Sequence, residues 1–394
     1  MRQKHTTPIR SGLQSDRQRS TFMLKIATLV TALSVMITVA VPSQVQTAHA
    51  VGAVQAVSIS AAAPLAAPKA QLKSVQVGKQ SFKVSTVTIP KGYRVSATFG
   101  KQQYGTSASL GGIVKANQAV AAINGTFFEA YTGVPEPWGT LIINGKIEHM
   151  GNTGTIIGFD RQGQVLMDTL RIQITGTVES KATGKKNNWY TYFVNRTPAK
   201  NGSSAVLYTP MRGKNIGFTY GKAVVVEQGV VKKIAAGQNV AIPTNGFVLV
   251  YTGKEMRMAD RFAVGDLVDV QTKYTNAAGK ELDWSEVQTA IGAGPRLVKE
   301  GQIALNPAQE GFKQDKILSL SATRSGIGVM SDGSVMLATI PSATMSQWAA
   351  IWKQLGAKQA MNLDGGASSG LYANGKMITE PGRALSNALL FRKP

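Results

Sequence analysis

The stretch Met361-Asn-Leu-Asp-Gly-Gly-Ala-Ser-Ser-Gly-Leu371 joins an apolar approach to a short polar turn. The residues before Asp364 predict a strand, and the two glycines after it predict a tight turn, because glycine adopts backbone angles that other residues resist. Such a turn leaves the Asp364 carboxylate at the strand end, and its successive N–H groups can hold an anion. Asp, Gly and Ser are also ordinary turn residues, so the stretch by itself is equally compatible with a capped turn.

A few helices are predicted among many strands. In residues 342–356, apolar residues recur at spacings of three and four, which predicts a helix with Ser342 as its N-cap and two core tryptophans on one face. A shorter helix is predicted over residues 109–117. Two Asn-Gly pairs, beginning at Asn144 and Asn374, predict tight hairpins because this dipeptide favours two-residue hairpin turns.

The strands point to the fold class. Residues 119–123 are all apolar, as expected for a strand that is buried on both faces. Residues 165–285 contain short β-type runs separated by turn residues, which indicates a β-rich insertion or subdomain. We therefore expect an α+β fold with a mixed β-sheet core, few helices and this β-rich block.

The amino-terminal residues 1–50 have the pattern of a secretory signal peptide. Basic residues between Arg2 and Lys25 precede an apolar run from Ile26 to Val41, and Ala48-His-Ala50 offers a small-residue cleavage site. The run is short for a membrane span, although an uncleaved anchor is the alternative. We expect an exported protein, secreted or associated with the cell wall. Residues 51–71, rich in Ala and Pro, predict a linker before a domain over 72–394.

The chain is strongly basic, with 43 Lys and Arg against 21 Asp and Glu and a formal net charge of +22. The charge is spread along the sequence without a basic helix or arm, which argues against nucleic-acid binding. A diffuse positive field suits an anionic glycan or a phosphate-rich cell-wall surface, and it also serves solubility. The oligomeric state stays open.

The absence of some residue types narrows the chemistry. The chain has no cysteine, and His149 is its only histidine after the predicted signal peptide. This composition excludes thiol catalysis and a multi-histidine zinc site. A Ser-His-Asp triad would have to use His149, which lies on the outgoing strand of a predicted hairpin. We expect the chemistry to rest on carboxylates, Arg, Lys, Tyr, Ser and backbone amides.

Four polar segments follow one another along the chain, most of them at the end of an apolar run. They are Ile123-Asn-Gly-Thr-Phe-Phe128, Ile291-Gly-Ala-Gly-Pro-Arg-Leu297, Ser321-Ala-Thr-Arg-Ser-Gly-Ile-Gly328, and the Asp364 turn with Arg383 and Ser386-Asn387 beyond it. If they converge, their arginines would suit an anionic ligand, because a guanidinium matches phosphate oxygens. In this order, the segments resemble the phosphodiester glycosidase family from about residue 119 to 391.

The resemblance implies hydrolysis of a sugar-1-phosphodiester, of the GlcNAc-1-phosphodiester type, between the anomeric carbon and the phosphate. The substrate would belong to a cell-wall polymer or exopolysaccharide. Two departures from the family pattern stand out: Ala322-Thr323, where many relatives have His-Pro, and Ala367, where a third glycine is common. The first departure affects the expected substrate contacts, whereas the second is conservative in size.

The expected roles follow from this chemistry. Asp364 would activate water or attack the sugar carbon, with Glu129 or Glu136 as the second carboxylate. Arg296, Arg324 and the turn amides would stabilise the departing phosphate. The predicted catalytic residues are Asp364, Arg324 and Glu129. The predicted substrate-binding residues are Asn124, Gly125, Arg296, Gly365, Gly366, Ser368, Ser369, Arg383 and Asn387.

Three alternatives stay open. A divalent cation such as calcium could bind Asp364 and carbonyl oxygens, although no clustered aspartates of the calcium-loop kind are present. The protein could instead be a non-catalytic module that binds wall polymer. It could also be a hydrolase or lyase for another anionic glycan.

Overall fold

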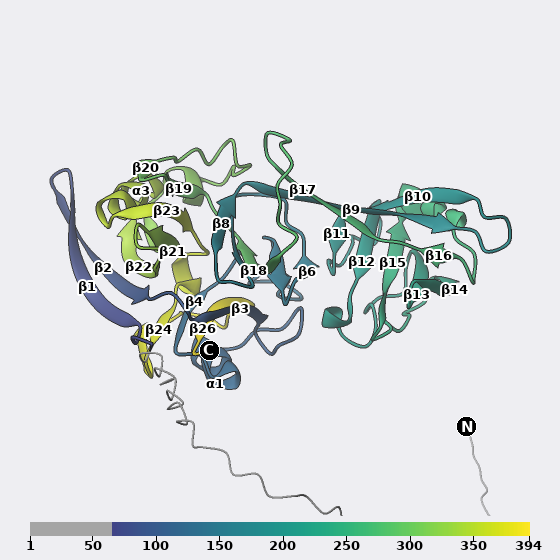
Figure 1. Ribbon diagram of the computed structural model, residues 1–394, viewed down its shortest axis with the longest axis horizontal. Coiled ribbons are helices and arrows are strands. Elements are labelled where there is room, and N and C mark those ends of the chain that lie inside the picture. The colour runs from purple at the N-terminus through teal and green to yellow at the C-terminus, as the bar shows by residue number, and fades with distance from the viewer. Residues whose placement is uncertain (1–64) are drawn as a thin grey trace, which may run out of the picture. The chain divides into compact units, whose positions relative to one another are not determined.

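Residues 65–394, the part of the chain that the computed structural model describes, form four β-sheets with a few short helices (Figure 1). The predicted signal peptide and residues 51–64 of the predicted linker lie outside this part. Within it, the one parallel strand pair joins β11 (Phe193–Val194) to β12 (Ser204–Tyr208). The fold is therefore mostly β, and the mixed sheet expected for the core is wrong, because the core strands pair antiparallel.

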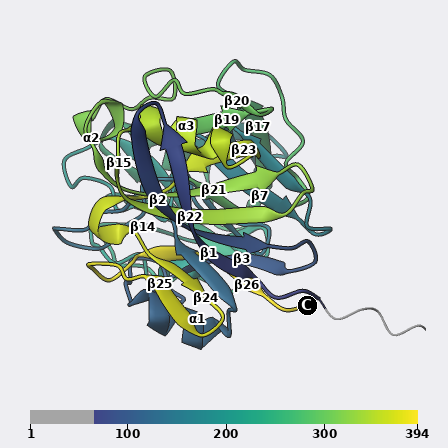
Figure 2. The ribbon, with the colours of Figure 1, turned by 90° about the vertical axis from the view of Figure 1, so that its left-hand side faces the viewer.

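A seven-stranded sheet carries the approach to Asp364. Its strands, in spatial order, are β1 (Lys69–Val77), β2 (Gln80–Ile89), β22 (Val335–Ala343), β21 (Ala322–Met330), β23 (Ala357–Asn362), β19 (Arg296–Lys299) and β20 (Gln302–Ile303). Figure 2 shows β1 and β2 beside β22 and β21. Because β1 begins at Lys69, ordered structure starts earlier than Leu72, and the carboxyl-terminal end of the predicted linker is a strand.

Helix α3 (Met345–Gln354) packs on this sheet. Its N-cap is Thr344 rather than the predicted Ser342, because Thr344 forms a reciprocal capping box with Gln347. Trp348 and Trp352 are fully buried with their rings 5.4 Å apart and edge to face, so the prediction of core tryptophans is confirmed. Strand β21 has a glycine beneath the Trp352 ring, because a Cβ at Gly328 would lie 2.5 Å from that ring.

Two five-stranded sheets complete the core. One contains β25 (Lys376–Thr379), β24 (Leu371–Ala373), β4 (Ala121–Asn124), β26 (Asn387–Arg392) and β3 (Arg94–Phe99), with α1 (Leu110–Asn117) packed on it. The other contains β6 (Lys146–His149), β5 (Leu141–Ile143), β18 (Val287–Gly292), β7 (Ile156–Asp160) and β8 (Val165–Asp168). Side chains from all three core sheets share one apolar cluster, which includes Ile123, Leu141 and Ile327. Both predicted Asn-Gly hairpins are confirmed, at β5–β6 and at β24–β25.

The fourth sheet forms the β-rich insertion, residues 170–276. Its strands are β10 (Lys186–Thr191), β9 (Leu170–Glu179), β16 (Leu267–Val268), β14 (Val230–Ala236), β13 (Lys222–Glu227), β15 (Gly246–Thr252), β12 and β11, with β17 (Gln271–Asn276) paired to β9. Most of the strands expected in this block are present, but β8 belongs to a core sheet. Among residues 65–394, no helix combines the length and the apolar character needed to cross a membrane.

Candidate functional site

The first and fourth polar segments meet at the Asp364 turn. Asp364 follows β23 at its carboxyl end, and its N–H donates to the carbonyl of Gly125 over 3.1 Å. The Asn124 amide clamps both ends of the turn: it donates to the Asp364 carbonyl over 2.7 Å and accepts from the Gly370 N–H over 3.0 Å. Asn124 is buried and both ends of its amide are bonded within the turn, so we assign it a positioning role rather than the expected substrate contact.

Asn387 holds the Asn124 segment in the same way. Its side-chain oxygen accepts from the Thr126 N–H over 2.7 Å, and its main-chain carbonyl accepts from the Gly125 N–H over 3.2 Å. A Cβ at Gly125 would lie 2.0 Å from that side-chain oxygen, so only glycine allows this approach. The structure thus makes Gly125 and Asn387 supports of the turn, although the sequence had suggested substrate contacts.

The third segment lies against the turn through its backbone. Ser325 accepts from the Leu363 N–H over 2.9 Å, and the Thr323 carbonyl lies 2.6 Å from where a Gly365 Cβ would be. The guanidinium of Arg324 is buried and donates to the carbonyls of Ala343, over 2.9 Å, and Leu320. Burial also lowers the pKa of Arg324. The Arg324 guanidinium therefore bonds to main-chain carbonyls inside the fold. This geometry corrects the expectation that Arg324 stabilises the departing phosphate.

The second segment supplies a similar buried clamp. Arg296 donates to the carbonyl of Met167 on β8 over 2.8 Å and to the side chain of Gln359 on β23. Gln359 precedes Asp364 by five positions, so this guanidinium is directed along β23 away from the turn. Arg296 joins two core sheets, and the expected role in phosphate stabilisation is not supported by its geometry.

The turn amides are largely used by the turn itself. The Gly365 N–H donates to the Asp364 carboxylate over 2.9 Å, and the N–H groups of Ser368 and Ser369 donate to the Gly365 and Gly366 carbonyls over 3.2 and 3.1 Å. These bonds close the 3₁₀ turn Gly366–Ser368. The expected cradle of free amides over residues 365–369 is therefore incomplete, and an anion here needs side-chain donors.

The carboxyl group of Asp364 is tuned by its surroundings. Burial raises its pKa from 3.8 to about 6, while hydrogen bonds from Ser368 and the Gly365 N–H and the charge of Arg383 oppose the rise. No second carboxylate contributes to this shift. A carboxylate with a pKa near neutrality can accept a proton and release it again at physiological pH, as a general base must.

The two candidates for the second carboxylate differ in how they are bonded. Glu129 accepts from the Tyr131 and Thr132 N–H groups of its own loop over 3.0 and 3.2 Å, and these bonds lower its pKa. Glu136 forms an ion pair with Arg212 at 2.9 Å. Neither carboxylate contributes to the pKa shift of Asp364, and the pairing of Asp364 with Glu129 stays a prediction.

Tyr131 is the neighbour of the site that sequence reasoning missed. Its hydroxyl accepts from Arg383 Nη2 over 3.0 Å, and the Arg383 guanidinium lies 4.8 Å from its ring centroid. The hydrogen bond from Arg383 lowers the pKa of Tyr131, and the charge of Asp364 acts in the opposite direction. Tyr131, Arg383 and Asp364 thus share one electrostatic environment. The available signal was an aromatic residue in the polar loop directly after the Asn124 segment.

His149 does not belong to this group. It is buried, its Nδ1 bonds to the carbonyl of Gly139 at 2.7 Å, and burial lowers its pKa to about 4. The ring is therefore neutral at physiological pH. No hydrogen bond within residues 65–394 joins it to a serine or an aspartate side chain, so the histidine triad that the sequence left open has no geometric support.

The residues at the turn do not fit a calcium site. Calcium takes six to eight oxygen ligands, commonly from several carboxylates. Within residues 65–394, no three acidic or histidine side chains gather as a metal-binding group, and Asp364 stands without a second carboxylate.

A cavity of about 800 Å³ lies elsewhere in the molecule. It is lined by Lys91, Arg161 and Gln288 among others and contains none of the four polar segments.

Comparison with known families shows a resemblance over part of the chain. Residues 220–392 match the model of the phosphodiester glycosidase family, which supports a glycosidase-like hydrolase. The match contains the second, third and fourth polar segments, so the resemblance seen in the sequence is confirmed. A search of curated proteins found no match.

Two solved structures share the fold of this chain at low sequence identity, and a third aligns more weakly. A hypothetical protein from Synechocystis aligns with a TM-score of 0.72 and 24% identity over 82% of this chain and 62% of its own. The chain therefore spans less than two thirds of that protein. A protein from Burkholderia pseudomallei K96243 that is described as exported gives 0.65 and 21% over 79% and 74%. The zebrafish N-acetylglucosamine-1-phosphodiester alpha-N-acetylglucosaminidase catalytic domain, auto-inhibited by its pro-peptide, gives 0.47 and 12% over 84% and 85%.

Proposed function

We propose that this protein is an exported hydrolase that cleaves sugar-1-phosphodiester bonds, of the GlcNAc-1-phosphodiester type, in a cell-wall polymer or exopolysaccharide. The observation that carries the proposal is Asp364, whose carboxyl pKa is raised to about 6 at a strand end beside Arg383. The family match over residues 220–392 supports a reaction of this class. The secretory pattern of residues 1–50 supports export.

The reaction needs one base and a site for a departing anion. Asp364 accepts a proton from water as the water oxygen bonds to the anomeric carbon. The bond between that carbon and the phosphate oxygen breaks, and its electron pair leaves with the phosphate monoester. This leaving group departs as an anion, so Arg383 stabilises it by charge and no strong acid is required.

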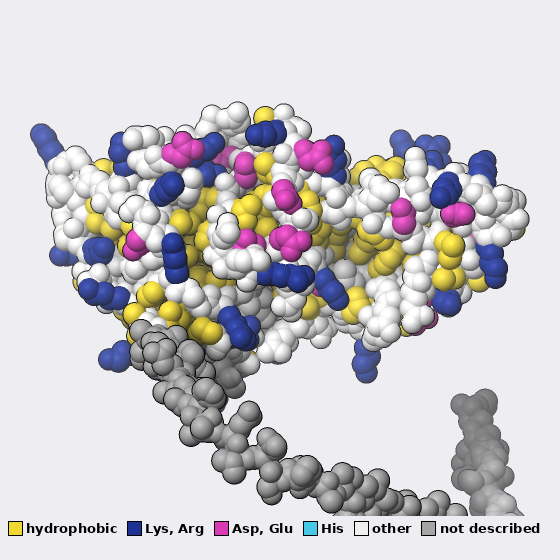
Figure 3. Space-filling model, viewed as in Figure 1, with side chains coloured by type: hydrophobic (Ala, Val, Ile, Leu, Met, Phe, Trp, Pro, Cys, Tyr) yellow, Lys and Arg dark blue, Asp and Glu magenta, His cyan; other side chains and the backbone are white. Residues whose placement is uncertain are grey.

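A wall-binding module without catalysis is the second candidate, and the surface charge favours it. Figure 3 shows Lys and Arg side chains scattered over the visible face among fewer acidic ones. Such a surface attracts anionic polymer without any reaction. The two candidates differ in one product: the hydrolase releases a phosphate monoester and a free sugar, whereas the module retains the polymer unchanged.

The test is turnover of a synthetic GlcNAc-1-phosphodiester by the purified protein, with release of GlcNAc and phosphate monoester measured separately. Asp364→Asn should lower kcat/KM by about 10²- to 10⁴-fold, the usual contribution of a general base. Asp332→Asn, in the turn between β21 and β22, is the matched control and should retain full activity. Full turnover by Asp364→Asn would remove the proposed role, and retention of wall polymer without products would favour the module.

A further inference from the structure

The loop between Glu129 and Glu136 bonds to Arg383 and Ser386, which follow the Asp364 turn in the chain. Its two ends are joined by the Glu129 N–H donating to the Glu136 carbonyl over 2.9 Å. Ser386 donates to the Pro135 carbonyl over 2.8 Å and thereby ties the loop to the start of β26. The loop is thus fixed at its base, and Tyr131 lies at its exposed end.

Tyr131 combines exposure with a fixed hydroxyl. Tyr131 is 78% exposed, and its ring lies against the Arg383 guanidinium. Because the hydroxyl accepts from Arg383, its own proton stays available for donation to an oxygen atom. Arg383 uses Nη2 for this bond, and its other N–H groups form no hydrogen bond with residues 65–394. A hydroxyl donor and guanidinium donors therefore face solvent together in the electrostatic environment of Asp364.

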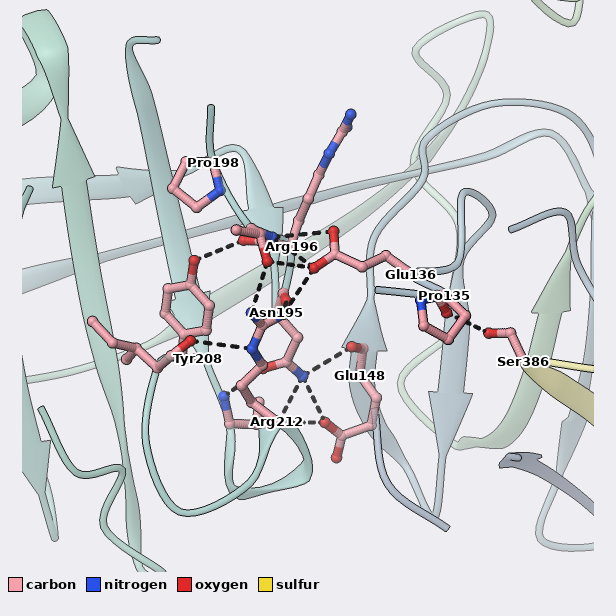
Figure 4. A network of polar contacts seen from close by, with 12 residues as sticks. Pro135, Glu136, Glu148, Asn195, Arg196, Pro198, Tyr208, Arg212 and Ser386 are labelled. Atoms are coloured by element: carbon pink, nitrogen blue, oxygen red, sulfur yellow. Dashed lines mark hydrogen bonds and ion pairs between the residues drawn. The ribbon is translucent and has the colours of Figure 1, made fainter. Parts of the chain in front are cut away.

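The β-rich insertion holds the carboxyl-terminal end of the same loop, at Glu136. Arg212 lies at the end of the 3₁₀ turn Pro210–Arg212, pairs with the Glu136 carboxylate at 2.9 Å and donates to Thr197 Oγ1 over 2.7 Å. Thr197 N–H donates to the same carboxylate over 3.1 Å, and Figure 4 shows Arg212 and Glu136 within this network. The Arg212 and Glu136 side chains are only 10% and 16% exposed. Loss of one partner leaves a charge nearly buried and unpaired, so the loop should shift to hydrate it.

We propose that Tyr131 binds the phosphate of the substrate together with Arg383, and that Arg212 of the insertion positions this loop over the Asp364 turn. The inference rests on the proposed function, since it assigns Tyr131 to the phosphodiester of that reaction. It gives the insertion a role, because Arg212, in a turn between two of its strands, sets the geometry of a phosphate subsite in the core domain. Tyr131 is then a substrate-contacting residue, and Arg212 is a positioning residue that does not touch the substrate.

Two variants separate these roles. Tyr131→Phe keeps the ring and removes one hydrogen bond to a charged ligand, so kcat/KM should fall about 10- to 100-fold. Arg212→Gln should raise KM several-fold with a smaller change in kcat, because the loop is displaced while Asp364 is unaffected. Glu136→Gln should give the same KM effect. The controls lie on the insertion: Tyr192→Phe, at an exposed tyrosine, is compared with Tyr131→Phe, and Arg257→Gln, at an exposed arginine, is compared with Arg212→Gln.

The decisive experiment measures kinetics on a GlcNAc-1-phosphodiester and, separately, the binding of GlcNAc-1-phosphate by calorimetry for the full-length protein and these variants. We expect the affinity for GlcNAc-1-phosphate to fall at least tenfold in Tyr131→Phe, to fall less in Arg212→Gln and to stay unchanged in the controls. The inference would be overturned if the wild type turns over the diester and Tyr131→Phe stays within twofold of it in both binding and kinetics. The proposed function would then remain intact.

Other outcomes separate the phosphate subsite from the proposed hydrolase activity. If the wild type binds GlcNAc-1-phosphate through Tyr131 but releases no product, the subsite stands and the hydrolase proposal fails. If it neither binds this compound nor turns the diester over, both fail. If Arg212→Gln lowers thermal stability but leaves KM unchanged, Arg212 is merely structural and the positioning role is wrong.

Discussion

Asp364 and Glu310 each have a carboxyl group whose pKa is raised by burial, yet their settings differ. Glu310 accepts from the Arg296 N–H and from Thr155 Oγ1, both over 2.7 Å, deep between core segments. Asp364 is partly exposed at the end of a strand, and its neighbours Arg383 and Tyr131 face solvent. A raised pKa alone therefore does not mark a site. Access for a substrate and unspent donors beside the carboxyl group separate Asp364 from Glu310.

The largest effect expected from this difference is on the pH dependence of catalysis. The base must be ionised, so kcat/KM should rise through about pH 6, the pKa of Asp364, and level off above it. The rise should be absent in the residual activity of Asp364→Asn. Glu310→Gln should keep the wild-type profile, since Glu310 is bonded inside the fold. A profile of wild type that is flat between pH 5 and 8 would contradict the assignment of the base.

Substitution of Gly125 should have the next largest effect. Its absent Cβ leaves room for Asn387 Oδ1, 2.0 Å from where the atom would be. Gly125→Ala should reduce the free energy of unfolding by about 1–3 kcal/mol through overpacking, and should also displace the turn that carries Asp364. Denaturant unfolding and turnover measure the two effects. Gly133→Ala, in the exposed loop with no atom near its Cβ position, shows the cost of its positive backbone angle without a clash.

The Glu310 carboxylate should matter for stability and hardly for activity. Glu310→Gln weakens the bonds from Arg296 N–H and Thr155, so the free energy of unfolding should fall by about 1–3 kcal/mol. Turnover of the folded fraction should stay within twofold of wild type. A loss of activity comparable to that of Asp364→Asn, with stability unchanged, would place Glu310 in the site and undo the comparison.

The sequence predicts these regions unequally, for physical reasons. Local signals placed the strand before Asp364, both Asn-Gly hairpins and helix α3, because turn chemistry and apolar spacing depend on nearby residues. The convergence of Asn124 and Asp364 was left as a condition by the sequence, and the structure shows it. The direction of a side chain was not predictable: Arg296 and Arg324 look like phosphate ligands in sequence but donate to buried carbonyls. Tyr131 was missed because its partner, Arg383, lies 252 positions away in the chain.

The smallest effect tests the cost of keeping Asp364 ionised in its partly buried position. Its pKa in the fold, about 6, lies above the ordinary value of 3.8, so between these pH values the folded state binds more protons than the unfolded state. Stability contributed by this group is therefore fully present below about pH 4 and is lost as the pH rises through 6. Asp364→Asn removes the ionisation, and partial exposure limits the gain to about 1 kcal/mol at pH 8. Thermal unfolding should show the variant to be more stable than wild type at pH 8 and no more stable at pH 4. Equal differences at both pH values would mean that the carboxylate is not strained by burial, and the raised pKa that sets Asp364 apart as the base would lose its support.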